Sequence, residues 1–151
     1  AEITEKNMRD VLEVRKALEE LAVQLACEKI TAEEIEEMKK AAEEFRMILK
    51  NKDITEIAEA DVRFHDIIYM ATDNQKLIQL LNNLREQMYR YRVEYLKDVE
   101  SRKTLVEEHY AVYRALKARN QQQAVKDICI HIVNQQNAIL RSLEQMNKEE
   151  Q

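Results

Sequence analysis

The segment Thr31–Leu49, with the sequence TAEEIEEMKKAAEEFRMIL, shows most directly how this chain folds. Its first four residues form a capping box, because the side chains of Thr31 and Glu34 can each accept a hydrogen bond from the other's backbone N–H at a helix start. The segment therefore predicts an amphipathic helix that buries one face and fades at Lys50–Lys52. Apolar residues recur at the spacing of that face: Ile35, Met38, Ala42, Phe45 and Leu49.

Similar apolar stripes on both sides of this segment divide the chain into about six helices. Because only a few residues connect these helices, neighbours are expected to be antiparallel. We therefore predict an all-α fold, a single antiparallel bundle of about six helices. The other expected helices are one that ends near Ile30 and those over about Asp53–Ala71, Leu77–Tyr95, Ser101–Leu116 and Asn120–Ile139.

The composition excludes several other classes of protein. The 151 residues include no glycine, no proline and no tryptophan, so strand-rich folds with tight turns and glycine-rich nucleotide-binding loops are not expected. Hydrophobic residues make up 45% of the chain, and its net charge of −5 comes without a basic block that would favour nucleic-acid binding. We expect one domain over residues 1–151, with no membrane segment and no secretory signal.

The two cysteines of the chain are Cys27 and Cys129. Their spacing fits neither a metal-binding motif nor a disulfide framework. We expect both to be small core residues of a reduced, cytoplasmic protein.

Polar residues interrupt the apolar stripes of three of the expected helices. Asp61 and His65 are four residues apart and so share one face of their helix, while His109 and His131 lie on the stripes of two others. Burying these groups without partners is costly. Gathered in one place, they suit a divalent transition metal: zinc, with nickel, manganese or iron as alternatives. The other interpretation is that each histidine is an ordinary core residue, bonded to a backbone carbonyl or a carboxylate.

Three arginines lie on or beside the apolar faces of two further helices. Arg15 interrupts the stripe of the first helix, and Arg85 and Arg92 border that of the fourth. A permanently charged guanidinium in such a position needs an anionic partner. We expect these arginines to face the metal across a pocket and to bind a small carboxylate, which would have its other end on the metal. The alternative is that they reach solvent or pair with an internal glutamate.

These residues resemble the FCD domain, the effector-binding C-terminal domain of FadR-type GntR transcription regulators, from about Asp10 to Asn137. Asp61, His65, His109 and His131 together match the motif of the metal-containing members. The other matching stretches are Glu13-Val-Arg15-Lys-Ala-Leu18-Glu19, Asp61-Val-Arg-Phe64-His65, Ala71-Thr-Asp-Asn74 and Glu108-His109.

The resemblance implies a six-helix antiparallel bundle, a homodimer, and a divalent metal near the bottom of a central pocket. It also implies a small organic acid as effector, with Arg15 matching the pocket arginine of the family. The branch that binds acyl-CoA lacks the histidine set. Two departures concern helix ends: Arg119 stands where the family usually has glycine, and Gln75 where it often has proline.

The winged helix-turn-helix that precedes this domain in such regulators is absent from the 151 residues. We therefore expect residues 1–151 to form a single effector-binding and dimerisation domain, which meets operator DNA only through that other domain. The leading hypothesis is a sensor and not an enzyme.

Two other functions remain open. A single-metal hydrolase or other metalloenzyme is the runner-up, although Glu108 would be its only neighbouring general base, and no Glu-x-x-His pair of a di-iron bundle precedes any histidine. A purely structural helical module without metal is the third. Elemental analysis of the purified protein separates the third from the other two.

Overall fold

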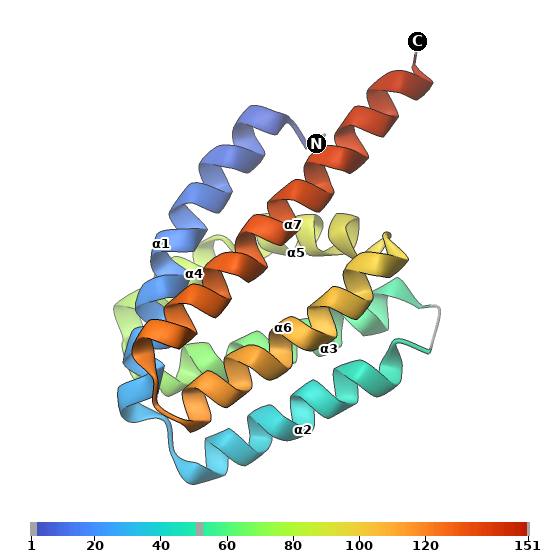
Figure 1. The fold of residues 1–151 in the computed structure, drawn as a ribbon. Coiled ribbons are helices and arrows are strands. Elements are labelled where there is room, and N and C mark those ends of the chain that lie inside the picture. The colour runs from blue at the N-terminus through green and yellow to red at the C-terminus, as the bar shows by residue number, and fades with distance from the viewer. Residues whose placement is uncertain (1–2, 51–52, 151) are drawn as a thin grey trace.

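The computed structural model describes residues 3–50 and 53–150, and these contain α-helices and no strand. The predicted all-α class is therefore confirmed. Within the described ranges no helix is both long and apolar enough to cross a membrane. The seven helices of these ranges are α1 (Glu5–Lys29), α2 (Ala32–Ile48), α3 (Ile54–Ala71), α4 (Gln75–Asn83), α5 (Arg85–Leu96), α6 (Val99–Lys117) and α7 (Gln121–Glu149) (Figure 1).

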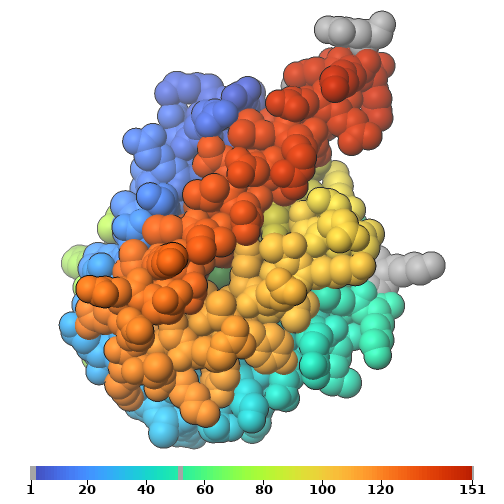
Figure 2. Space-filling model, viewed as in Figure 1, coloured from blue at the N-terminus to red at the C-terminus, as the bar shows by residue number. Residues whose placement is uncertain are grey.

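The long helices α1 and α7 lie side by side, and α7 also packs on α6 (Figure 1). Helices α2 and α3 run antiparallel to each other, as do α6 and α7, which agrees with the short connections. The ends of α1 and α7 that carry the chain termini extend beyond the other helices. In the space-filling view α7 lies along the surface between α1 and α6 (Figure 2). The largest apolar cluster forms where α1, α2, α3, α4, α6 and α7 meet.

The helix expected over Leu77–Tyr95 is two helices, so the bundle has one helix more than the sequence predicted. The break falls at Leu84, whose N–H bonds to the carbonyl of Leu81, three residues back, in place of continuing the α-helical ladder. It follows Asn82 and Asn83, which are weak helix formers. The change of direction turns α5 onto α3 and α7, which brings its inner face to the centre of the bundle.

The polar residues expected to start helices do so. Thr31 and Glu34 form the predicted capping box, and the side chains of Asn74 and Asn120 accept hydrogen bonds from backbone N–H groups in the first turns of α4 and α7. Asp98 caps α6, so that helix begins slightly earlier than expected. Residues 51–52 of the predicted connection lie outside the described residues.

The two departures from the family pattern have different outcomes. Gln75 begins α4 normally behind its Asn74 cap. Arg119 adopts the left-handed conformation that usually calls for glycine, with φ of 54°. Its N–H bonds to the carbonyl of Leu116, and the N–H of Asn120 bonds to Ala115, which completes a Schellman motif at the end of α6.

The side chain of Arg119 offsets this backbone conformation. Its guanidinium donates hydrogen bonds to carbonyls at the last turn of α1: Cys27 at 2.9 Å, Glu28 at 3.4 Å and Ile30 at 2.5 Å. These acceptors would otherwise lack partners at a helix C-terminus. Arg119 therefore joins the ends of α1 and α6.

The cysteine prediction is half right. Cys27 is buried in the core, as expected. Cys129 is only half-buried, and its thiol donates to Glu20 on α1 at 2.7 Å. The sequence interpretation missed this because residue 129 lies beside the apolar stripe of α7 and not on it.

Candidate metal and effector site

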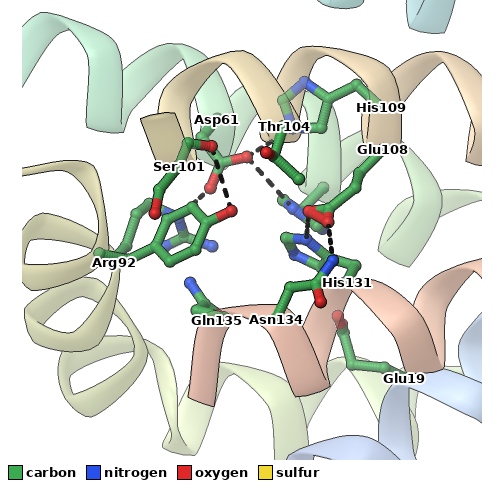
Figure 3. Close-up of polar contacts among 12 residues, drawn as sticks. Glu19, Asp61, Arg92, Ser101, Thr104, Glu108, His109, His131, Asn134 and Gln135 are labelled. Atoms are coloured by element: carbon green, nitrogen blue, oxygen red, sulfur yellow. Dashed lines mark hydrogen bonds and ion pairs between the residues drawn. The ribbon is translucent and has the colours of Figure 1, made fainter. Parts of the chain in front are cut away.

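A cluster of charged and polar side chains lies buried at the centre of the bundle. Helices α1, α3, α5, α6 and α7 each contribute to it, and Figure 3 shows most of its members pointing toward one another. It holds all three histidines of the chain. Its charged members are Arg15, Glu19, Asp61, Arg92 and Glu108.

Asp61 is the centre of the cluster. Its Oδ1 lies 2.6 Å from Nε2 of His109 and 3.3 Å from Nε2 of His65. Its Oδ2 accepts a hydrogen bond from Nε of Arg92 at 2.5 Å (Figure 3). The carboxylate thus links α3 to α6 through one oxygen and to α5 through the other.

Two phenylalanines fix the ring of His109. Phe64 stacks on the imidazole with 4.2 Å between ring centroids, and Phe45 meets it edge-on at 4.6 Å. Both side chains are fully buried in well-packed surroundings. The helical spacing that made Phe64 a core residue therefore also orients the neighbouring imidazole toward Asp61.

His131 lies next to this group, on α7. Its ring stacks against His65 with centroids 5.1 Å apart. Glu108 holds its Nδ1 through Oε1 at 3.0 Å, while the other oxygen of Glu108 accepts a hydrogen bond from Asn134 at 2.9 Å (Figure 3). The Nε2 of His131 is buried without a hydrogen-bond partner. A carboxylate on one imidazole nitrogen and a free second nitrogen is the arrangement found in metal-binding histidines.

Burial and pairing set the protonation of these groups. Burial alone would raise the pKa of Asp61, but His65 and Arg92, together with the hydrogen bond to His109, hold it well below its usual value. Burial lowers the pKa of His109 to about 4 and also lowers that of His65. Asp61 is thus favoured as a carboxylate, and His65 and His109 as neutral imidazoles, the forms that bind a metal ion.

Arg15 is fully buried on α1. Its Nη1 donates to Oε1 of Gln135 on α7, and its Nη2 lies 3.5 Å from Oε2 of Glu19. No hydrogen bond reaches its Nε or its Nη2, nor either oxygen of Glu19. The prediction that Arg15 faces inward agrees with this position, and its neighbour Glu19 is the internal glutamate of the alternative.

The other two predicted arginines occupy different places. Arg92 is buried and bonded to Asp61, so its first partner is a predicted metal ligand. Arg85 is half exposed and pairs with Asp66, with Nη2 and Oδ1 2.9 Å apart. Both arginines border an outer hollow of about 680 Å³ and a smaller one of about 10 Å³ that reaches His65. The smaller hollow hardly accommodates a water molecule, so the expected central pocket is closed in this structure.

The structure brings Asp61, His65 and His109 within metal-binding reach of one another, since one ligand atom from each lies within 4.8 Å of the others. His131 stacks beside this triad but is not one of its members. Sequence reasoning missed the roles of Glu19, Glu108 and Gln135. The i,i+4 spacings of Arg15 with Glu19 and of His131 with Gln135 are the signals that point to two of them.

A divalent metal fits the residues that are present. Oδ1 of Asp61 and the imidazoles of His65 and His109 form a mixed oxygen and nitrogen donor set, which transition metals accept. Nδ1 of His65 and Nε2 of His131 are buried without hydrogen bonds, and Nε2 of His65 has only its 3.3 Å contact with Asp61. Buried polar atoms are normally paired, and a bound cation would pair these.

The sequence model of the FCD domain family matches residues 10–134. The HTH-type transcriptional regulator LutR of Bacillus subtilis is 32% identical over 134 residues, which are 85% of this chain and 60% of LutR. Among solved structures, E. coli McbR/YncC has a TM-score of 0.85 at 19% identity over 93% of this chain and 71% of that one. The metal-free FCD domain of TM0439 has a TM-score of 0.79 at 20% identity over 96% and 99%. The chain spans 58% and 60% of the length of the curated relatives that it matches.

Proposed function

The chain belongs to the FCD domain family of GntR-type transcription regulators, and we propose that it senses a small carboxylate effector through a bound divalent metal. The observation that carries this proposal is a set of nine buried polar atoms without hydrogen-bond partners, within the described residues. They belong to six residues of the central cluster: Arg15, Glu19, His65, Tyr69, His109 and His131. Buried atoms of this kind call for a specific explanation, and a metal with an acid ligand supplies one.

Asp61, His65 and His109 would hold the metal, and His131 would complete the set after a small shift. Zinc suits three imidazoles and a carboxylate, with nickel, manganese and iron as alternatives. When bound, the ion supplies a Lewis-acidic anchor for a carboxylate oxygen.

Residues around these ligands keep them in position. Glu108 fixes the tautomer and orientation of His131 by taking its Nδ1. Arg92 holds Oδ2 of Asp61, which leaves Oδ1 facing the histidines. We therefore assign Arg92 to positioning the carboxylate and give the grip on the effector to Arg15. Arg85, paired with Asp66 at the surface, would meet an acid only at the outer hollow.

Transmission would follow from the helices that carry these groups. Arg15 lies on α1, whereas the proposed ligands lie on α3, α6 and α7. An acid held by both would draw α1 toward the others and favour one of two arrangements of the bundle. We propose that a DNA-binding domain preceding α1 in the full-length protein responds to this shift, so that operator binding depends on the effector.

A homodimer is the proposed assembly, in the cytoplasm. The outer face of α1 carries apolar residues at i, i+4, i+7 and i+11 that its own bundle covers only in part: Val14, Leu18, Leu21 and Leu25. A second copy could cover this stripe with the same stripe, as a two-fold interface requires. A monomeric mass in solution, unchanged by Leu21→Glu, would contradict this part of the proposal.

The relatives and the family are transcription regulators and not enzymes. We therefore assign no reaction to the metal site. The test of the proposal is calorimetry on metal-loaded protein with a panel of hydroxy, keto and sugar acids. We expect at least one acid to bind, and to bind much more weakly to His109→Ala. Absence of any bound transition metal after purification and reconstitution, or undiminished binding by the variant, would overturn it.

A further inference from the structure

Glu19 is a buried carboxylate beside Arg15 in the proposed effector site. Its side chain is 1% exposed and lies one helical turn from Arg15, with 3.5 Å between the paired atoms. Arg15 and the hydroxyl of Tyr69 face its buried oxygens, but neither oxygen accepts a well-aligned hydrogen bond. In the close-up it points from α1 toward His131 (Figure 3). An acid held by Arg15 would therefore lie beside a carboxylate that can accept a further hydrogen bond.

The hydroxyl of Tyr69, on α3, is a second polar group in this part of the site. It is buried next to Glu19, without a well-aligned hydrogen bond. Burial, and then the charge of Glu19, raise the pKa of Tyr69 well above its usual value, so its hydroxyl stays neutral. Beside His65 and His131, the site thus offers an acceptor that carries a full charge and a hydroxyl that can donate or accept.

The charges of the cluster limit what can enter. Apart from the histidines, the buried charged residues of the described chain are two arginines and three carboxylates, which sum to a formal charge of −1. A divalent cation changes this to +1. A monocarboxylate then neutralises the cluster, a dicarboxylate makes it negative again, and an amino acid, with no net charge, leaves it positive. Uncompensated charge in a buried site is costly.

We propose that Glu19 makes the site selective for monocarboxylates that carry a hydroxyl group, and excludes dicarboxylates of the same length. This inference rests on the proposed function. The effector carboxylate takes Arg15 and the metal, and its hydroxyl donates to Glu19, with Tyr69 as a second partner. An acid without a hydroxyl takes part of Arg15 from Glu19 and gives Glu19 no hydrogen bond in return, and a second carboxylate meets Glu19 as a like charge. Unpaired buried polar groups and like charges both give strong discrimination.

Three acids with the same number of carbon atoms test the inference: glycerate, propionate and malonate. Their affinities for the metal-loaded protein are measured by calorimetry at one pH and ionic strength. A hydrogen bond to a charged group corresponds to a preference on the order of 10- to 100-fold. We expect glycerate to bind more tightly than propionate by about that factor, and malonate to bind most weakly.

The variant Glu19→Gln removes the charge and keeps the shape. We expect it to weaken glycerate binding and strengthen malonate binding, so that the ratio of the two affinities falls on the order of 10-fold or more. The matched control is Glu20→Gln, because Glu20 points to Cys129 and Lys16 at the edge of the α1–α7 contact and not into the site. This control should keep the ratio of the wild-type protein.

The outcomes separate the inference from the proposed function. If none of the acids of the larger panel binds, the proposed function fails. If acids bind but malonate equals or exceeds glycerate in the wild-type protein, the inference fails and the proposed function stands. An unchanged ratio in a folded Glu19→Gln also overturns the inference. The wild-type series decides the question even where the variant does not fold, which thermal unfolding reveals.

Discussion

Arg119 and Arg15 both join two helices through a guanidinium, but Arg119 makes more hydrogen bonds to the protein than Arg15 does. Arg119 binds three carbonyl oxygens at the end of α1. Arg15 lies deeper and donates only to Gln135, with Nε and Nη2 left without hydrogen bonds. The two side chains carry the same charge, but they differ in how many of their N–H groups donate to an acceptor in the protein. The remaining donors of Arg119 lie at the surface, which fits a structural role, whereas those of Arg15 are buried, which calls for a specific explanation.

The largest effect is expected from Asp61→Ala, because it removes the partner of the buried Arg92. Breaking a buried pair by removing one member costs about 3–5 kcal/mol of unfolding free energy. Urea unfolding of the metal-free protein measures this. Asp66→Ala is the control, because its pair with Arg85 is half exposed and contributes roughly 0–1 kcal/mol. Equal losses in the two variants would show that burial does not distinguish these pairs.

A bound metal ion should pair some of the buried polar atoms of the central cluster that make no hydrogen bond. Zinc or nickel at a concentration 100 times the Kd adds about 2.7 kcal/mol of stability, seen as a higher Tm that a chelator reverses.

Glu108→Gln should weaken metal binding by about 10- to 100-fold, because Glu108 orients His131. Its exposed neighbour Glu107 supplies the control, Glu107→Gln. A similar loss of metal affinity in both variants would show that Glu108 has no specific role in holding the metal.

Arg15→Met should weaken binding of glycerate to the metal-loaded protein by on the order of 10- to 100-fold, since a charged hydrogen-bond donor is lost. Calorimetry gives the affinity, and elemental analysis should find the metal content unchanged. Lys16→Met changes an exposed charge on the same helix and should bind as the wild type does. Loss of metal along with the acid would mean that Arg15 supports the fold of the site and not the effector.

The smallest effect concerns Arg119. Arg119→Ala and Arg119→Gly both lose the bonds to α1, but only glycine adopts a positive φ without strain. The glycine variant should therefore be the more stable of the two by about 1 kcal/mol, measured by urea unfolding. Acid and metal affinities should be the same in both variants. A change in either affinity would contradict the separation of the two arginines into structural and ligand-binding roles.

Most of the fold could be predicted from the sequence because each helix is determined by apolar spacing and capping residues within its own segment. Stripes such as the one from Ile35 to Leu49 and caps such as Thr31 and Asn120 each act within one helix, and the structure contains them. The break at Leu84 was missed because the apolar stripe continues across it. Nothing in the spacing separates a straight helix from one that bends onto a different neighbour.

The site was less accessible to sequence reasoning. The pair Asp61 and His65 could be predicted, because i,i+4 residues always share a helix face. The link between Glu108 and His131 could not, since Glu108 points away from its neighbour His109 and its partner is on another helix. Arg92 was predicted to bind an effector, but its bond to Asp61 depends on how α5 packs against α3.

In the proposed function, the bond from Arg15 to Gln135 competes with the effector for the guanidinium. An incoming acid would have to displace a glutamine that is already bonded to Arg15. The effector concentration at which the protein responds would then depend on the strength of this bond as well as on the fit of the acid. Substitutions at position 135 could adjust the threshold of the response while every group that touches the acid stays the same.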